Sequence, residues 1–213
     1  KTYSEDGQLI MSGALPNGKG QDGLQYMARL KGANKKGALQ YVGDRLVVEN
    51  ADEVILYLSA STDYVLDPPN YKGRDYKNIT EANINKALAK SFNQLLADHT
   101  QEYQNYFKRV SFDITPEPIT PIPTGTRLAN YKETKNDTHL EELMFHYGRY
   151  LLISSSRPGT LPANLQGIWA NKIQTPWNGD YHTDINVQMN YWLAETTNLS
   201  ELHMPLFNLI TSL

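Results

Sequence analysis

Residues 157–192 read RPGTLPANLQGIWANKIQTPWNGDYHTDINVQMNYW and contain all three tryptophans of the chain. Many amide and carboxylate side chains and one histidine lie between these tryptophans. Aromatic rings present flat apolar faces, whereas amides and carboxylates present directional hydrogen-bond donors and acceptors. Polar groups at this density cannot all be buried without partners, so we expect some of them to face a cavity. The mixture suits a pyranose, which has an apolar C–H face and a rim of hydroxyls, and it indicates a sugar-binding site.

The composition excludes several classes of protein. Of the 213 residues, 40% are hydrophobic and 20% are charged, which is typical of a globular protein. The net charge of −3 provides no basic surface for nucleic acid, and no apolar run approaches the ~20 residues that span a bilayer. The chain has no cysteine, and its histidines show no HxH or HExxH spacing. We therefore expect no nucleic-acid partner, no membrane, no metal ion and no cofactor.

The beginning of the chain indicates a piece of a longer protein. It starts Lys1-Thr2-Tyr3, with no recognisable signal peptide. The absence of cysteine is compatible with a periplasmic or extracellular protein. We expect one of these two locations, with the leader upstream of this chain.

The first part of the chain, residues 1–79, reads as a β domain. Alternating apolar residues and Gly- or Pro-containing turns predict strands over 8–15, 24–30, 38–42, 46–48 and 54–61. Strands at roughly ten-residue spacing favour an antiparallel β-sandwich. One layer cannot bury both of its faces, so we expect an incomplete sandwich that other parts of the polypeptide complete.

The middle of the chain, residues 80–135, is predicted to connect two domains. Apolar residues at helical spacing predict a single long helix over 81–108, with Thr80 as its N-cap. A strand-like stretch at 110–114 is followed by a run with four prolines, which excludes helix and central strand there. We interpret 109–135 as an irregular boundary segment.

The last part of the chain, residues 136–213, reads as helical. Thr138 and Glu141 predict a capping box at the start of a helix that ends before Ser154. A long loop over 157–183 and helices near 186–195 and 200–213 are predicted to follow. An apolar stripe runs along the first of these helices and contains Leu140, Leu143, Met144, Tyr147, Tyr150 and Leu151. The complete pattern is that of an α+β multidomain protein.

Several segments of this helical part resemble glycoside hydrolase family 95, the inverting α-L-fucosidases. They are NLQGIW at 164–169, WNGDYH at 177–182, DINVQMNYW at 184–192 and YGRYLLISSSR at 147–157. The resemblance is close over about 136–210 and extends to the earlier half in layout only. It implies part of an N-terminal β-sandwich at 1–79, a linker helix and proline-rich connector at 80–135, and the first helices of an (α/α)6 barrel at 136–213.

The resemblance also implies roles for individual residues. In the family, two asparagines two positions apart hold the attacking water, and Asn186 matches the second of them. Asp184 stands at the first position, where its carboxylate either accepts the proton from water directly or changes the sugar that is preferred. His182 matches a histidine of the sugar pocket. The remaining substrate-binding candidates are Trp169, Asn164 and Gln166.

The residues themselves leave alternatives open in this segment. If the backbone is extended, the side chains of His182, Asp184 and Asn186 project to the same side and can contact the same ligand. Alternatively, Asp184 caps the helix that begins near Asn186, because Asp is favoured at N-caps. Trp169 is explained equally well as a stacking face and as a packing residue.

The resemblance implies hydrolysis of terminal α-L-fucosyl residues, with an α-1,2 linkage and inversion of the anomeric centre. An inverting glycosidase needs a general acid about 6.5–9.5 Å from its base. No residue of this chain matches the family's glutamic acid, so we expect this chain alone to be inactive and to depend on the remainder of its own polypeptide. The expected partner is a fucosylated oligosaccharide or glycan. The alternatives are an α-L-galactosidase of the same family and a non-catalytic glycan-binding protein.

Overall fold

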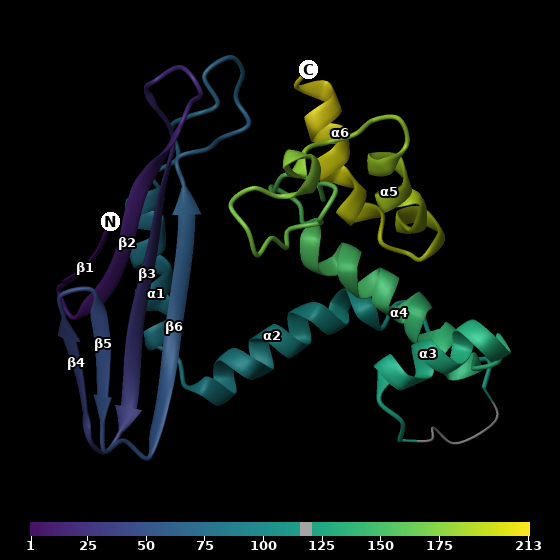
Figure 1. The fold of residues 1–213 in the computed structure, drawn as a ribbon, viewed down its shortest axis with the longest axis horizontal. Helices are drawn as coiled ribbons and strands as arrows, with labels where there is room; N and C mark the ends of the chain where they lie inside the picture. The colour runs from purple at the N-terminus through teal and green to yellow at the C-terminus, as the bar shows by residue number, and fades with distance from the viewer. Residues whose placement is uncertain (116–120) are drawn as a thin grey trace. The chain divides into compact units, whose positions relative to one another are not determined.

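The computed structural model describes residues 1–115 and 121–213 (Figure 1). These residues fold into two compact units, Lys1–Asp98 and His99–Leu213. The first unit contains an antiparallel sheet, and the second contains helices joined by a long loop. The chain is therefore an α+β protein, as predicted. The proposed domain bounds at 79/80 and 135/136 stay predictions.

The first unit is built on a four-stranded antiparallel sheet with the strand order β1-β2-β3-β6, beside a separate β4–β5 hairpin. The five predicted strands are confirmed. Strand β1 was not predicted, because its four residues, TYSE, contain one apolar side chain and so show no apolar alternation. The strands are β1 (Thr2–Glu5), β2 (Gln8–Pro16), β3 (Asp22–Lys35), β4 (Ala38–Val42), β5 (Arg45–Glu49) and β6 (Glu53–Thr62).

Helix α1 (Tyr76–Leu88) packs on β3 and β6 and covers one face of this sheet (Figure 1). Ile10 of β2 and Ile84 of α1 are almost completely buried. On the opposite face Leu58 of β6 is 71% exposed, since successive residues of a strand point to opposite sides. The sheet therefore has one covered face and one apolar face that no described residue of this unit covers fully.

The single long helix predicted over 81–108 is wrong. The structure has α1 and a second helix, α2 (Phe92–Phe107), with a break between them. At the break, the N–H of Gln94 donates to Oγ of Ser91 (3.3 Å), and the N–H of Ser91 donates to Oε1 of Gln94 (2.8 Å). This reciprocal pair is a capping box and begins a new helix. Thr80 is not the N-cap of α1, because the side chain of Asp75 caps it.

The prediction of an irregular segment over 109–135 is wrong in its second half. Residues 110–114 form no strand, and residues 116–120 of the proline-rich run lie outside the described residues. Helix α3 (Thr124–Thr134) begins directly after Pro123, the last proline of the run. Proline is tolerated at a helix start because the first N–H groups of a helix have no partner within it. The prolines therefore set where this helix begins, and they do not prevent a helix after Pro123.

Helix α4 (Thr138–Ser155) is the longest helix of the second unit. Its N-cap is Asp137 rather than the predicted Thr138, with the N–H of Leu140 donating to Oδ1 at 2.9 Å. The guanidinium of Arg127 in α3 donates to both oxygens of the same carboxylate, at 2.5 and 2.8 Å. One carboxylate thus caps α4 and connects it to α3.

The core of the second unit lies where α4 meets α5 (Asn186–Thr196), the 3₁₀ turn η2 (Ser200–His203) and α6 (Met204–Thr211). Ile153 of α4 is completely buried there. The apolar stripe predicted on α4 lies largely outside this core, because Met144 is 78% exposed. The fully buried residues of the core include Ile153, Ala194, Leu199 and Leu202.

Arg149 of α4 is completely buried and connects α4 to the end of α2. Its Nη1 donates to the carbonyl of Phe107 (2.7 Å), and its Nη2 donates to the carbonyl of Tyr106 (2.9 Å). The last carbonyls of a helix have no partner within it and carry its partial negative charge, so a guanidinium stabilises them. Burial lowers the pKa of Arg149, yet a guanidinium remains protonated in proteins.

We predict that Arg149→Ala destabilises the second unit by about 3 kcal/mol, because charge-assisted hydrogen bonds are lost and buried carbonyls are left without donors. Chemical denaturation measures the change. Lys132→Ala, on the exposed side of α3, is the control and should shift stability by at most about 0.5 kcal/mol. Equal stabilities of the two variants would contradict the role of Arg149.

We predict acid sensitivity at the start of α4. Hydrogen bonds from Arg127, and to a smaller extent from the N–H of Leu140, lower the pKa of Asp137 to about 2. A carboxyl group with a lowered folded-state pKa contributes stability above its ordinary pKa of about 3.9 and loses it as the pH falls. The protection factors of the amides in the first turn of α4, which correct for the intrinsic pH dependence of exchange, should therefore fall between about pH 4 and pH 2. Asp137→Asn should remove this dependence; an unchanged profile would contradict the prediction.

Candidate functional site

The candidate site lies in the long loop between α4 and α5, and its beginning is fixed to the core by Tyr191. The N–H of Ala163 donates to the Tyr191 hydroxyl, which is also 2.8 Å from Oγ of Ser156. Because Ser156 donates its own proton to the carbonyl of Leu202 (2.7 Å), Tyr191 donates to Ser156. Burial raises the pKa of Tyr191, so the hydroxyl stays protonated. A continuous hydrogen-bond chain therefore joins the loop to α5 and η2.

Asn164 shapes a tight turn immediately after this anchor. Backbone hydrogen bonds run in both directions between Asn164 and Gly167, at 3.2 and 3.0 Å. Oδ1 of Asn164 accepts from the N–H of Gln166 (2.8 Å), and Asn190 of α5 donates to the Asn164 carbonyl (3.0 Å). The side-chain oxygen of Asn164 already accepts a hydrogen bond within the turn. The main contribution of Asn164 is therefore to shape the turn, and its oxygen is not a free acceptor for a ligand.

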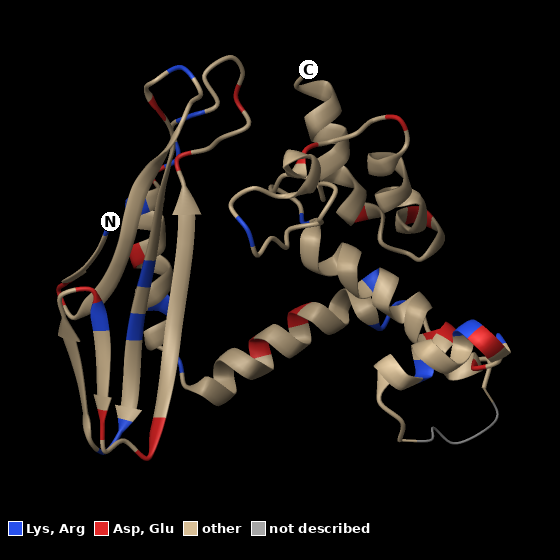
Figure 2. Ribbon diagram, in the orientation of Figure 1, with Lys and Arg blue, Asp and Glu red and all other residues tan. Residues whose placement is uncertain are grey.

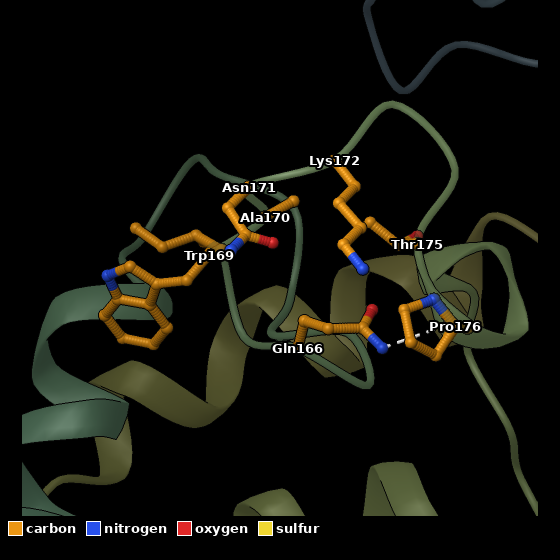
Figure 3. Close-up of a pocket in the computed structure, with 8 residues that line it drawn as sticks. Gln166, Trp169, Ala170, Asn171, Lys172, Thr175 and Pro176 are labelled. Atoms are coloured by element: carbon orange, nitrogen blue, oxygen red, sulfur yellow. Dashed lines mark hydrogen bonds between the residues drawn. The ribbon is translucent and has the colours of Figure 1, made fainter.

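Gln166 connects this turn to the 3₁₀ turn η1 (Pro176–Gly179). Its Nε2 donates to the carbonyl of Pro176 at 3.1 Å, whereas its Oε1 is buried and has no hydrogen-bond partner (Figure 3). Gly179 has a φ of +61°, and a Cβ there would lie 3.1 Å from this Oε1. Glycine is therefore favoured here by both the backbone conformation and the close approach of the Gln166 side chain.

A pocket of about 510 Å³ opens beside Gln166 (Figure 3). Figure 3 shows the side chain of Lys172 extending toward Gln166 and Pro176, with the indole of Trp169 at the other end of the group. Polar groups from the amide, ammonium and hydroxyl classes meet an aromatic ring here, which is the mixture expected for a hydroxylated ligand. The polar residues that line the pocket are Gln166, Asn171, Lys172 and Thr175.

Trp169 lies between this pocket and a second one of about 410 Å³ lined by residues of α4 and α5. Its ring packs on Gly167, where a Cβ would lie 2.6 Å from Cζ3 of the indole. Trp169 is nevertheless 43% exposed. Packing and stacking are therefore compatible, since one part of the ring is covered and another part is available.

His182 is the candidate whose side chain has a charged partner. Its Nε2 lies 2.7 Å from Oδ1 of Asp180, and its ring meets the ring of Trp177 edge-on at 5.7 Å between centroids. The sequence reasoning did not single out Asp180 as a partner of His182. The Asp-x-His spacing was an available signal, because residues two apart on an extended backbone share a side.

Asp184 and Asn186 are exposed at the start of α5. The extended backbone assumed for 182–186 is wrong, because residues 183–185 form a turn and the N–H of Val187 donates to the His182 carbonyl (2.9 Å). The alternative, that Asp184 caps α5, is also wrong: the N-cap is Ile185 and no side chain caps the helix. The catalytic and substrate-binding assignments of these residues stay predictions.

Charged residues of both signs are interspersed along both units (Figure 2). Within residues 1–115 and 121–213, no group of three or more His, Cys, Asp or Glu residues is arranged to hold a metal ion. None of the helices in the described part of the chain is both long enough and apolar enough to cross a membrane.

Residues 91–213 match the family model of the glycosyl hydrolase family 95 catalytic domain. The chain therefore belongs to glycosyl hydrolase family 95, as the resemblance of its motifs implied.

Curated relatives agree with this assignment. The chain is 41% identical over 203 residues to "Alpha-L-fucosidase 2" of Arabidopsis thaliana, which is 90% of this chain and 24% of that protein. It is 39% identical over 169 residues to "Probable alpha-fucosidase A" of Aspergillus niger, covering 76% of this chain and 21% of that protein. The similar protein of Aspergillus oryzae is 40% identical over 156 residues, 70% of this chain and 20% of its own. The chain thus spans between a fifth and a quarter of the length of these relatives.

We predict that Tyr191→Phe loosens the loop at its base. The variant keeps the ring but leaves the buried N–H of Ala163 without an acceptor, which costs about 1–3 kcal/mol. Amide exchange at Ala163 should accelerate, and chemical denaturation should show the loss of stability. Tyr147→Phe, at a tyrosine that is 54% exposed on α4, is the matched control and should change neither quantity. Unchanged exchange at Ala163 in Tyr191→Phe would disprove the anchor.

Proposed function

We propose that this chain is part of an α-L-fucosidase that removes terminal α-1,2-linked L-fucose from oligosaccharides with inversion. The single observation that carries the proposal is the family match over 91–213, supported by relatives named as fucosidases. The same proposal includes a periplasmic or extracellular location, which is consistent with the absence of cysteine.

The proposal assigns an architecture to both units. The sheet of the first unit forms one layer of a β-sandwich, and helices α4 to α6 begin an (α/α)6 barrel. Two exposed apolar faces support this arrangement, because Leu58 of β6 is 71% exposed and Met144 of α4 is 78% exposed. Apolar faces of this kind are normally covered by another layer. The remainder of the polypeptide supplies that layer and the general acid.

Asp184 acts in the proposed mechanism as the base that removes a proton from the attacking water. Its carboxylate is exposed and has no hydrogen-bond or ion-pair partner among the described residues. A carboxylate accepts protons directly, whereas an amide does so poorly. Asn186, two positions later, orients the water, and His182 contacts a sugar hydroxyl. In the same step, the general acid protonates the leaving oxygen from the opposite side of the sugar, so the C–O bond to the water forms as the glycosidic bond breaks.

A second candidate function follows from the same position. Asp184 stands where the family pattern has asparagine, and a carboxylate accepts an additional hydroxyl donor. L-galactose differs from L-fucose by a 6-hydroxyl, and a buried polar contact to one hydroxyl decides such preferences strongly. Rates on aryl α-L-fucosides and α-L-galactosides distinguish the two functions. Turnover of neither substrate by the full-length protein would overturn both.

We predict that Asp184→Asn in the full-length protein lowers the turnover of an aryl α-L-fucoside by about 10²- to 10⁴-fold, because general base catalysis is lost. L-fucose binding, measured by calorimetry, should persist. Asp113→Asn is the control, since that carboxylate is exposed and its hydrogen bond from the N–H of Thr115 is one that asparagine can retain.

Retained turnover in Asp184→Asn would remove Asp184 from the base role. Loss of turnover together with loss of fucose binding would assign Asp184 to sugar recognition instead. The stereochemistry is tested separately by proton NMR of the first product, which is β-L-fucose if the anomeric centre is inverted.

A further inference from the structure

Asp180 and His182 form a close ion pair near the end of the long loop of the candidate site. Oδ1 of Asp180 lies 2.7 Å from Nε2 of His182. At this distance an unprotonated Nε2 would repel the carboxylate oxygen, so the charge of Asp180 favours a proton on Nε2. The contact therefore selects the Nε2–H tautomer of the neutral ring and leaves Nδ1 as its acceptor.

The backbone on both sides of this pair is fixed. The carbonyl of Asp180 accepts from the N–H of Leu165 (3.3 Å), and the carbonyl of His182 accepts from the N–H of Val187 (2.9 Å). Between them, the Tyr181 hydroxyl donates to a carbonyl at the start of the loop at 3.0 Å. The pair is thus held between the Gln166 turn and the beginning of α5.

The pair contributes little to the stability of the fold. The side chains of His182 and Asp180 are 37% and 54% exposed, and exposed ion pairs are screened by water and salt. The ring of Trp177 contacts the imidazole edge-on, so two contacts together restrict its orientation. An oriented imidazole that remains open to solvent is suited to contact a ligand.

We propose that Asp180 is a positioning residue, which holds the imidazole of His182 so that Nδ1 accepts a hydrogen bond from a substrate hydroxyl. The inference rests on the proposed function, because it assumes that His182 contacts the sugar. Removing the carboxylate leaves the ring without a fixed tautomer. An asparagine both donates and accepts at the same place, so it does not select one form of the ring.

The test uses the full-length protein and an aryl α-L-fucoside. Asp180→Asn should raise KM about tenfold and change kcat by less than about threefold, because a contact made equally in ground state and transition state is lost. Asp180→Glu retains a carboxylate and should recover part of the affinity. Asp113→Asn, at an exposed aspartate outside the site, should leave KM unchanged.

A double-mutant cycle separates positioning from a general structural effect. If Asp180 acts through His182, Asp180→Asn should change KM by less than about twofold once His182 is replaced by alanine. Additive effects of the two substitutions would overturn the inference, as would an unchanged KM in Asp180→Asn alone.

If the wild-type protein turns over no fucoside, the proposed function has failed, and this result does not test the role of Asp180. In that case the pair is tested by ¹⁵N spectra of histidine-labelled protein, which report the tautomer of His182 directly. The Nε2–H form should dominate in the wild type, and Asp180→Asn should yield a mixture of tautomers. The same single tautomer in both proteins would overturn the inference without any reference to activity.

Discussion

The helical unit depends on a buried guanidinium. Arg149 lies inside the unit and donates to the last carbonyls of α2, so the charge that α4 buries is stabilised by a helix end that otherwise lacks donors. Arg157, two residues beyond the end of α4, pairs with both carboxylate oxygens of Glu102 in α2. Arg149 therefore fixes α4 against α2, and Arg157 fixes the start of the loop that follows α4.

That loop has no regular structure over most of its length, yet it is tied at defined points. The hydroxyl of Tyr191 holds its beginning, the amide of Gln166 connects its two halves, and the carbonyl of His182 joins its end to α5. Each tie uses a backbone group of the loop. Irregular backbone close to a core must find hydrogen-bond partners. Many of the amide side chains in 157–192 therefore bond to the loop backbone and are not all available to a ligand.

The sequence predicted where helices and strands occur better than it predicted where they end and which of their sides are buried. Period-two alternation located five strands, because a sheet with one covered face imposes that pattern locally. The break between α1 and α2 was readable from Ser91 and Gln94 but was outweighed by the continuous apolar spacing around it. Which face of α4 is buried was not readable, since burial depends on neighbours distant in sequence. The Asp-x-His spacing was an available signal of a contact between Asp180 and His182, and the structure shows it. The site residues that the family resemblance implied stay predictions.

Side chains in this loop can be exposed while the loop is ordered, because the hydrogen bonds that hold the loop involve its backbone. A side-chain atom that already holds the backbone is less available to a ligand, as the oxygen of Asn164 shows by accepting the N–H of Gln166. Asp184 and Asn186 differ, since the adjacent backbone is fixed through the carbonyl of His182 while their side-chain groups are free of partners in the described chain. The fixed backbone loses little entropy on binding, and the side chains meet a ligand with their full hydrogen-bonding capacity.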